Sequence, residues 1–229
     1  MATYRTCRLG VSMKEVKKKF AEGFCFKKLF LIFVIGCIFG AYYEEIGVIF
    51  MKGHWEPRRG LMYGPFSPVY GICLLLAAII FCRKDIKWYK AFIWCFFLGG
   101  ILEYGLSVVQ EVLFNSRSWD YSGYFLDIGG RTTGVFMFIW GIIGTLFIKI
   151  VYPFLSNLIE KIPYDIGQIV YVILLIFMVI NISISLVANI RQAARKKGQE
   201  PITFIGEFCD KFYPDEVIQK IYVNSEYNN

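Results

Sequence analysis

Five long apolar blocks, separated by short charged segments, constrain the fold of this chain more than any other feature. Each block is about 17 to 25 residues long, enough for a helix to cross a hydrocarbon core of about 30 Å. Lipid offers no partner to backbone N–H and C=O groups, so such blocks must form helices. The sequence therefore predicts an all-α, polytopic integral membrane bundle of about five transmembrane helices, at about residues 29–50, 66–82, 91–113, 133–152 and 166–190.

The composition agrees with this class and excludes others. Hydrophobic residues make up 56% of the 229 residues and charged residues only 19%, whereas a soluble domain carries about 25% charged residues. This excludes a soluble globular enzyme and an intrinsically disordered chain. Because the spans use so much of the sequence, a large extramembrane domain is excluded as well.

Charge, cysteine and histidine content give no sign of nucleic acid, metal or cofactor. The net charge is +7, but the basic residues flank apolar blocks, where anionic lipid headgroups are the simpler partner. The seven cysteines form no C-x-x-C pair, and His54 is the one histidine. We therefore expect the lipid bilayer as a partner, and no nucleic acid, metal site, disulfide framework or cofactor.

Three segments follow from the pattern. They are a basic N-terminal segment at residues 1–28, the transmembrane domain at 29–190, and a basic and then polar C-terminal tail at 191–229. The first segment has no signal-peptide cleavage site, so the first span is expected to be retained. In the tail, Ile205, Phe208 and Phe212 recur at helical spacing and predict a short helix lying on a surface.

The distribution of Lys and Arg predicts a multi-pass protein of the cell membrane with a cytoplasmic N-terminus. In that orientation fourteen Lys and Arg lie inside and eleven outside, or five outside without the tail. The basic cluster of Arg191, Arg195, Lys196 and Lys197 works against it. Either the tail is translocated, or one apolar block does not cross.

Acidic side chains inside spans are the most informative residues. Glu44 lies in the first block, and Glu103 and Glu111 lie in the third. A carboxylate at the bilayer centre costs about 3 kcal/mol on insertion scales, so these groups should face protein or water. Gly100, Glu103, Ser107 and Gln110 share one helix face. For Glu103, a functional role and a structural ion pair are equally good interpretations.

Small and polar residues mark further helix faces. A face of small residues lets two helix backbones approach closely, and we interpret these as packing surfaces. They are Gly36 and Gly40 in the first block, Gly100 in the third, and Gly141 and Gly144 in the fourth. Asn181, Ser185 and Asn189 recur every four residues in the last block, where we favour hydrogen bonds between helices over substrate contact.

The loops after the first and third blocks share Trp, Arg, acidic and Gly residues, including Trp119 and Asp120 in the second loop. They indicate two degenerate helical hairpins followed by one further helix. Arginine outside the cytoplasm opposes the charge trend. Our hypothesis is that Arg59 and Arg131 fold back and pair with Glu44, Glu103 or Glu111, which would relieve both desolvation costs.

Several short motifs extend across these blocks and loops. They are Gly40-Ala41-Tyr42-Tyr43-Glu44, Arg59-Gly60, Gly64-Pro65-Phe66-x-Pro68-x-Tyr70-Gly71, Glu103-Tyr104, Trp119-Asp120-Tyr121-Ser122, Gly130-Arg131 and Trp140-Gly141. Through them, residues 30–190 resemble the type IV ABC-transporter permease family of small bacterial membrane proteins. The resemblance implies Asn at the position where this chain has Asp127.

The resemblance implies a membrane-spanning permease subunit of unknown substrate. The chain holds no G-x-x-x-x-G-K-[ST] motif, so a separate ATP-binding subunit would supply the energy. Of the two loops on the predicted cytoplasmic side, the one at residues 83–90 is short, so the loop at residues 153–165 is the better docking candidate for that subunit. Five short spans enclose little space, so we expect a homo-oligomer.

Two other functions stay open at this point. One is an intramembrane enzyme on lipid-linked substrates, with Glu103 or Asp120 as general acid or base and with Arg59 and Arg131 holding phosphate. The other is a non-catalytic membrane sensor or assembly partner. No Cys/His dyad, H-E-x-x-H or G-x-S-x-G motif occurs, so we name no catalytic residue and favour a non-enzymatic role.

Overall fold

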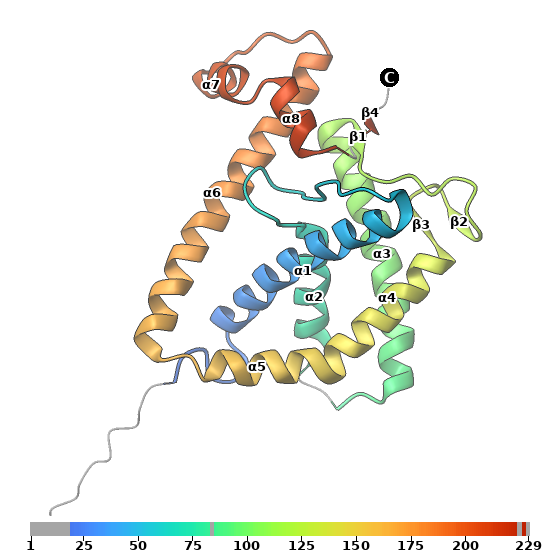
Figure 1. Ribbon diagram of the computed structural model, residues 1–229, viewed down its shortest axis with the longest axis vertical. Coiled ribbons are helices and arrows are strands. Elements are labelled where there is room, and N and C mark those ends of the chain that lie inside the picture. The colour runs from blue at the N-terminus through green and yellow to red at the C-terminus, as the bar shows by residue number, and fades with distance from the viewer. Residues whose placement is uncertain (1–18, 83–84, 224–225, 228–229) are drawn as a thin grey trace, which may run out of the picture.

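The computed structural model describes residues 19–82, 85–223 and 226–227, and it is almost entirely helical (Figure 1). The helices are α1 (Phe26–Lys52), α2 (Pro68–Phe81), α3 (Trp88–Phe114), α4 (Gly134–Leu146), the π-helical turn η1 (Phe147–Val151), α5 (Tyr152–Glu160), α6 (Tyr164–Lys196), α7 (Phe204–Phe212) and α8 (Asp215–Ile221). Two antiparallel ladders pair β1 (Ser116–Arg117) with β4 (Glu226–Tyr227), and β2 (Asp127–Ile128) with β3 (Thr132–Thr133). The predicted class, a helical membrane bundle, is confirmed.

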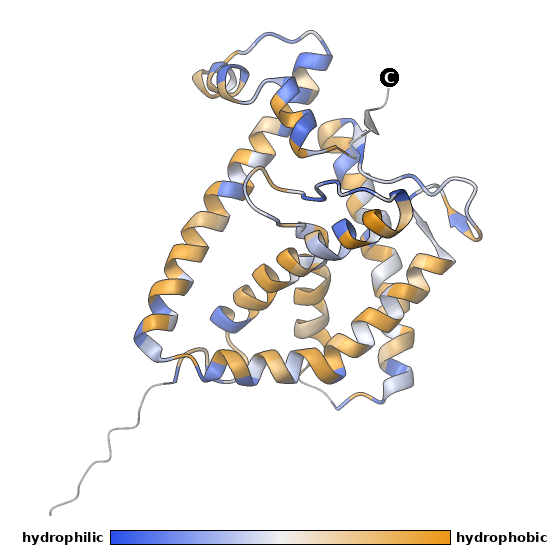
Figure 2. Cartoon of the chain, in the orientation of Figure 1, coloured by the Kyte–Doolittle hydropathy of each residue, from blue (hydrophilic) through white to orange (hydrophobic). Residues whose placement is uncertain are grey.

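Four segments are long and apolar enough to cross a membrane: α1, α3, the continuous helix Gly134–Glu160, and α6. Figure 2 shows apolar residues along these helices and polar residues gathered in the tail and the connecting loops. α2 has 14 residues, which rise only about 21 Å, less than a core of about 30 Å. The second predicted span, at residues 66–82, is therefore a helix too short to cross by itself.

The loop before α2 runs back into the molecule and lies beside α6. The Met62 N–H donates to Ser185 Oγ at 2.9 Å, and the Tyr63 N–H donates to Asn181 Oδ1 at 3.1 Å. The Asn181 amide returns a bond to the Tyr63 carbonyl at 2.7 Å. Asn181 lies near the middle of the 33-residue α6. The polar stripe of α6 thus bonds non-helical backbone, where we had expected bonds to another helix.

The same segment is also tied to α1 and to itself. The Ser67 N–H donates to the carbonyl of Cys37 on α1 at 2.9 Å, and the Gly60 N–H donates to the Phe66 carbonyl at 2.8 Å. Leu61 and Phe66 are buried. Irregular backbone at membrane depth is tolerated only where protein supplies its hydrogen bonds. We call residues 60–67 the broken span, because they and α2 together replace one full helix.

Helices α1 and α2 form one hairpin, and α3 and α4 form the other. An aromatic pair joins the hairpins, since the ring centroids of Tyr70 and Trp140 are 5.2 Å apart. A Cβ on Gly40 would lie 2.3 Å from the Tyr70 ring, and a Cβ on Gly99 would lie 2.3 Å from Trp140. Each ring therefore needs a glycine on the partner helix.

The glycines singled out in the sequence all lie at such close approaches. A Cβ on Gly36 would meet the α2 backbone at Gly71, and one on Gly100 would meet Met137. Cβ atoms on Gly141 and Gly144 would meet Phe92 and Cys95 on α3. Sequence reasoning missed Gly71 and Gly99, which serve the same purpose.

The helix that begins with α4 continues past the predicted end of its span. We expected residues 153–165 to form the loop between the fourth and fifth predicted spans. Most of that segment is instead helix α5. The π turn η1 lies directly before Pro153, and a π turn lets a helix change its bonding and bend. In Figure 1, α5 runs at an angle to α4.

The two ends of the bundle differ in what they carry. The start of α1 lies beside α5, where the buried Lys28 ammonium pairs with Glu160 and bonds Ser156 Oγ at 2.7 Å. The C-terminal tail lies at the opposite end (Figure 1). Its first helix, α7, confirms the helix predicted from apolar spacing. Residues 1–18 of the predicted basic segment, and the basic pair at 83–84, lie outside the described residues.

The hydrogen bonds of Asn181 generate a stability prediction. Replacing Asn181 by Ala leaves the part-buried Tyr63 N–H and C=O without their partner, at about 1 to 2 kcal/mol for each group. We expect the free energy of unfolding to fall by about 2 to 4 kcal/mol, measured by denaturation in detergent. Ser183→Ala on the exposed face of α6, where Ser183 bonds only its own helix, should change it by about 0.5 kcal/mol or less. Equal losses in both variants would contradict this account of the broken span.

Candidate functional site

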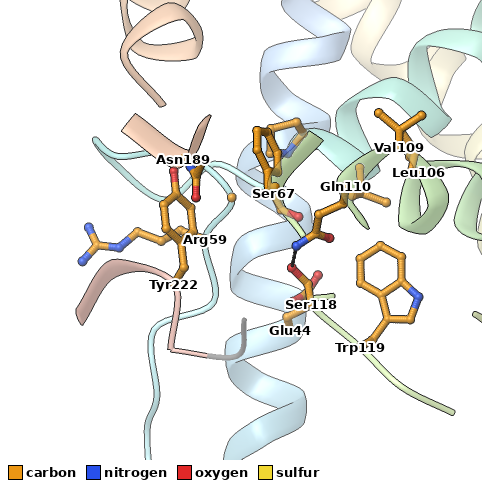
Figure 3. Close-up of a pocket in the computed structure, with 14 residues that line it drawn as sticks. Glu44, Arg59, Ser67, Leu106, Val109, Gln110, Ser118, Trp119, Asn189 and Tyr222 are labelled. Carbon is orange, nitrogen blue, oxygen red and sulfur yellow. Dashed lines mark hydrogen bonds between the residues drawn. The ribbon is translucent and has the colours of Figure 1, made fainter. Parts of the chain in front are cut away.

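A cavity of about 230 Å³ lies where the broken span, α3, α6 and the tail meet (Figure 3). Its walls come from segments that are far apart in the sequence. The lining residues are Glu44, Arg59, Gly60, Ser67, Pro68, Val69, Leu106, Val109, Gln110, Phe114, Ser118, Trp119, Asn189 and Tyr222. Of the predicted site residues, the structure brings Glu44, Arg59 and Trp119 together here.

One wall of this cavity is acidic and polar. Glu44 comes from α1, and Ser67 ends the broken span beside it. Across the cavity, Gln110 Nε2 donates to Ser118 Oγ at 2.7 Å. Figure 3 shows these four side chains around one space. The cavity therefore offers a carboxylate, an amide and hydroxyls to a ligand.

Arg59 does not form the ion pair that we predicted. In Figure 3 its side chain runs past Tyr222 and points away from Glu44, and within the described part of the chain it has no ion pair with an acid. Arg58 instead faces the acids of this region. Its guanidinium pairs with Glu56 at 3.1 Å, and its backbone N–H lies 3.4 Å from Glu45 Oε1.

Arg131 does fold back onto α3, as predicted. Its guanidinium pairs with Glu111, bonds Ser107 Oγ at 3.1 Å and lies over the Tyr104 ring, 5.7 Å from its centroid. Arg117 also holds Glu111, through bonds of 3.0 and 3.2 Å. The carboxylate of Glu111 is thus compensated by two guanidinium groups.

Glu103 is compensated by hydroxyl groups. It is 5% exposed, and it accepts bonds from Thr132 Oγ1 at 2.6 Å and from the Tyr121 hydroxyl at 3.2 Å. No ion pair with Arg131 or Arg59 is formed. Of the three acids predicted as partners of Arg131, the structure therefore pairs it with Glu111. Glu103 instead holds the loop after α3 against that helix.

The loop after α3 is shaped so that Arg131 reaches Glu111. Gly129 and Gly130 have φ values of +61° and +69° and turn the chain between β2 and β3. A Cβ on Gly130 would lie 2.6 Å from Asp120 Oδ1, so only glycine fits. Trp119 Nε1 donates to the Arg131 carbonyl at 2.9 Å.

The two aspartates of this loop have local bonding roles. Asp127 Oδ1 accepts the Gly130 N–H at 2.5 Å, a bond that an asparagine oxygen can accept equally well. Asp120 is exposed, and the Ser122 hydroxyl and N–H that bond it lower its pKa. Asp120 is therefore ionised at neutral pH and lies outside the cavity lining.

The acids thus differ in their surroundings. Glu111 is paired with arginines, and Glu103 is bonded by two hydroxyl groups. Glu44 has hydroxyl neighbours at Ser67 and Tyr70 and no ion pair within the described residues, and it is the one of the three that lines the cavity. The same part of the chain holds no cluster of three His, Cys, Asp or Glu side chains that could bind a metal ion. Tyr222 and Asn189 were missed as lining residues, because no local pattern in the sequence indicates that the tail folds back over the broken span.

These features define a multi-pass helical membrane protein with a small acidic cavity beside a broken span. Residues 31–186 match the sequence model of the family described as "Putative ABC-transporter type IV". The match covers more than half of the chain, so the protein belongs to this family, as the sequence motifs predicted. No curated protein and no solved structure matches the chain.

The pairing of Arg131 with Glu111 can be measured with a double-mutant cycle. We expect Arg131→Gln and Glu111→Gln to be coupled by about 0.5 to 3 kcal/mol in the free energy of unfolding, because each variant removes the same bond. The cycle of Arg131→Gln with Glu103→Gln serves as control and should show a smaller coupling. Additive effects of the Arg131 and Glu111 variants would refute the pairing.

Proposed function

We propose that this protein is the membrane-spanning subunit of an ABC-type transporter, and that the cavity at Glu44 binds a cation or the cationic group of a substrate. Family membership supports the first part. The cavity supports the second, because its one acidic side chain faces free space. We propose a homo-oligomer in the cell membrane, since the cavity at Glu44 measures only about 230 Å³ within one chain.

The observation that carries this proposal is the different treatment of the acids. An ionisable group within a membrane is costly, and it persists where a partner compensates it or where function requires it. Glu111 has two arginine partners, and Glu103 has two hydroxyl partners. Glu44 also has hydroxyl neighbours, Ser67 and Tyr70, but unlike Glu103 it lines the cavity, and it has no cationic partner within ion-pairing distance in the described part of the chain. A bound cation would supply it.

ATP hydrolysis would come from a separate subunit, because the 229 residues contain no P-loop motif. We propose that this subunit docks on α5. Phe154 and Leu158 are 65% and 52% exposed on one face of that helix, and the Lys28–Glu160 pair links α5 to the start of α1. In the proposed orientation this end faces the cytoplasm.

The geometry does not favour the enzymatic alternative. A general acid or base at Glu103 would have to give up its bonds to Thr132 and Tyr121. Arg131 is occupied by Glu111, and Arg59 points away from the acidic wall. Among the described residues, Glu44 and Arg59 line the same cavity, but the Arg59 side chain points away from Glu44, which does not favour joint action on a phosphate group.

The subunit role is tested by isolating the tagged full-length chain from its native membranes in mild detergent and identifying its partners by mass spectrometry. We expect a P-loop ATPase in fixed stoichiometry. Phe154→Ser with Leu158→Ser should abolish its recovery, and the pair Ile173→Ser with Ile176→Ser, exposed on α6, should not. Recovery of the chain alone at every detergent stringency would overturn the permease assignment.

The cation site is tested separately by thermal stability in the presence of sodium, potassium, ethylammonium and putrescine. We expect one of these probes to stabilise the wild type, since a ligand at 100 times its Kd contributes about 2.7 kcal/mol. Glu44→Gln should remove this stabilisation. Glu45→Gln, which removes a neighbouring carboxylate that bonds Trp55 and Arg58, should keep it. Stabilisation that survives Glu44→Gln would place the cation elsewhere.

A further inference from the structure

We propose that the C-terminal tail is a displaceable lid over the Glu44 cavity, and that Tyr222 on this lid forms part of the binding site. We call residues 197–223 together with β4 the strap. The proposal extends the proposed function. It rests on that function only for the identity of the ligand in the cavity, because the lid itself is argued from the contacts of the tail. The strap lies entirely outside residues 31–186, the part of the chain that matches the family.

The path of the strap bridges two walls of the cavity. It leaves α6 after Lys196, forms α7 and α8, and ends in β4, which pairs with β1 at Ser116 and Arg117. The wall residue Asn189 lies on α6, and the wall residues Ser118 and Trp119 directly follow β1. The strap therefore connects the α6 side of the cavity to the α3 side.

Tyr222 is the part of the strap that reaches the cavity. It is 8% exposed, lines the cavity and directs its hydroxyl toward Asn189 (Figure 3). Burial raises its pKa, so the hydroxyl stays protonated at neutral pH and can donate or accept a bond. A ligand held by Glu44 thus has a neutral hydroxyl at another wall of the same cavity.

Ion pairs anchor the strap to the end of α6. Arg191 binds Asp210 through two parallel bonds, 2.8 Å from Nε to Oδ1 and 2.7 Å from Nη2 to Oδ2. Arg195 bonds Asp210 at 2.6 Å and Asp215 at 2.6 and 2.8 Å. These contacts explain the arginines that opposed the predicted orientation, because their charge is compensated within the chain.

These anchors hold throughout the neutral pH range. The hydrogen bond from Arg191 lowers the pKa of Asp210. A depressed carboxyl pKa contributes stability that is fully present above the ordinary Asp value of about 3.9 and is lost only as pH falls through the lowered value. The strap is therefore expected to be closed at neutral pH until something competes for its anchors.

The strap also contacts the broken span. The Tyr213 hydroxyl lies 2.8 Å from the Tyr63 hydroxyl. Ile218 and Cys209 are buried with Met62 and Ala188 in a small apolar cluster, separate from the main core. The residues that the strap touches, Met62 and Tyr63, belong to the same loop as the cavity residues Gly60 and Ser67. Displacing the strap would thus uncover both the cavity and the loop that shapes it.

The contacts of the strap suit a part that can detach. Its apolar cluster is small, and Ile202, Phe204 and Phe212 are 97%, 79% and 53% exposed. Its main anchors are ion pairs to partly exposed aspartates, with side-chain exposures of 27% and 35%. Such pairs contribute much less than buried apolar surface. Helices α1 with α2 and α3 with α4, in contrast, pack at glycines where there is no room for a Cβ atom.

The test measures access to the cavity without any transport assay. Ser67, 7% exposed on the cavity wall, is replaced by Cys in the purified full chain, and its labelling by a hydrophilic maleimide is followed by peptide mass spectrometry. We expect Asp210→Asn with Asp215→Asn to accelerate labelling at least tenfold. The matched control, Glu207→Gln with Glu216→Gln, removes the same charge from exposed positions on α7 and α8 and should not.

Rapid labelling of the buried Cys37 would show that the aspartate variant has unfolded. A reversible disulfide between the strap and β1 tests the lid without that risk. Ser116 and Tyr227 are directly paired in the β1–β4 ladder, a spacing of about 4.5 to 5.5 Å that a disulfide accepts. In Ser116→Cys with Tyr227→Cys, oxidation should slow labelling at position 67 at least fivefold, and reduction should restore it. Two results would overturn the lid. One is a labelling rate that oxidation of the disulfide does not change. The other is an equal labelling rate in the folded Asp210→Asn, Asp215→Asn variant and in the folded Glu207→Gln, Glu216→Gln control.

The role of Tyr222 is tested with the Tyr222→Phe variant. We expect its Kd for the stabilising cation probe to rise at least threefold, and an unchanged Kd would show that Tyr222 is not part of the site.

Discussion

Backbone polar groups at membrane depth need partners, and this requirement organises the structure around the broken span. Residues 60–67 leave the helical conformation beside α6, where lipid would offer them no hydrogen bonds. Asn181 and Ser185 of α6 and the Cys37 carbonyl of α1 supply those bonds. Once the loop is held there, α2 can begin at Pro68, Ser67 reaches the cavity wall, and Met62 and Tyr63 form the surface on which the tail docks.

Charge compensation explains which acids are structural and which one is available. Two arginines neutralise Glu111, and hydroxyl groups hold Glu103, so both carboxylates fasten the loop after α3 to that helix. Glu44 faces the cavity with hydroxyl and amide groups around it and Arg58 near enough to act on it electrostatically, but it has no ion pair in the described part of the chain. The burial of the charged residues of α3 therefore builds the scaffold, whereas the burial of Glu44 leaves a free energy that a ligand can recover.

Periodicity and local motifs predicted the features that depend on neighbouring residues. The four long spans, the glycine contacts and the return of Arg131 to α3 follow from apolar block length, helical spacing and the Gly-Gly turn. The predicted Arg59 pair was wrong, because the loop directs Arg58 toward the acids. The helix at α5 was missed because a π turn before Pro153 has no clear sequence pattern. The strap meets the broken span and β1 through contacts such as Tyr63–Tyr213 and Ser116–Tyr227, which join residues more than 100 positions apart and which a single sequence does not indicate.

The contact between Tyr70 and Trp140 has a mechanical consequence. These rings join two hairpins that are each fixed internally by glycine contacts, and the contact between α2 and α3 is much smaller than the contacts within each hairpin. Each hairpin is therefore packed more extensively within itself than against the other, with the Tyr70–Trp140 pair among the contacts that join the two. Helix α6 is bonded to the first hairpin through the polar contacts of the broken span. A rotation of one hairpin against the other would change the width of the cavity that Glu44 and Gln110 both line, without breaking a helix.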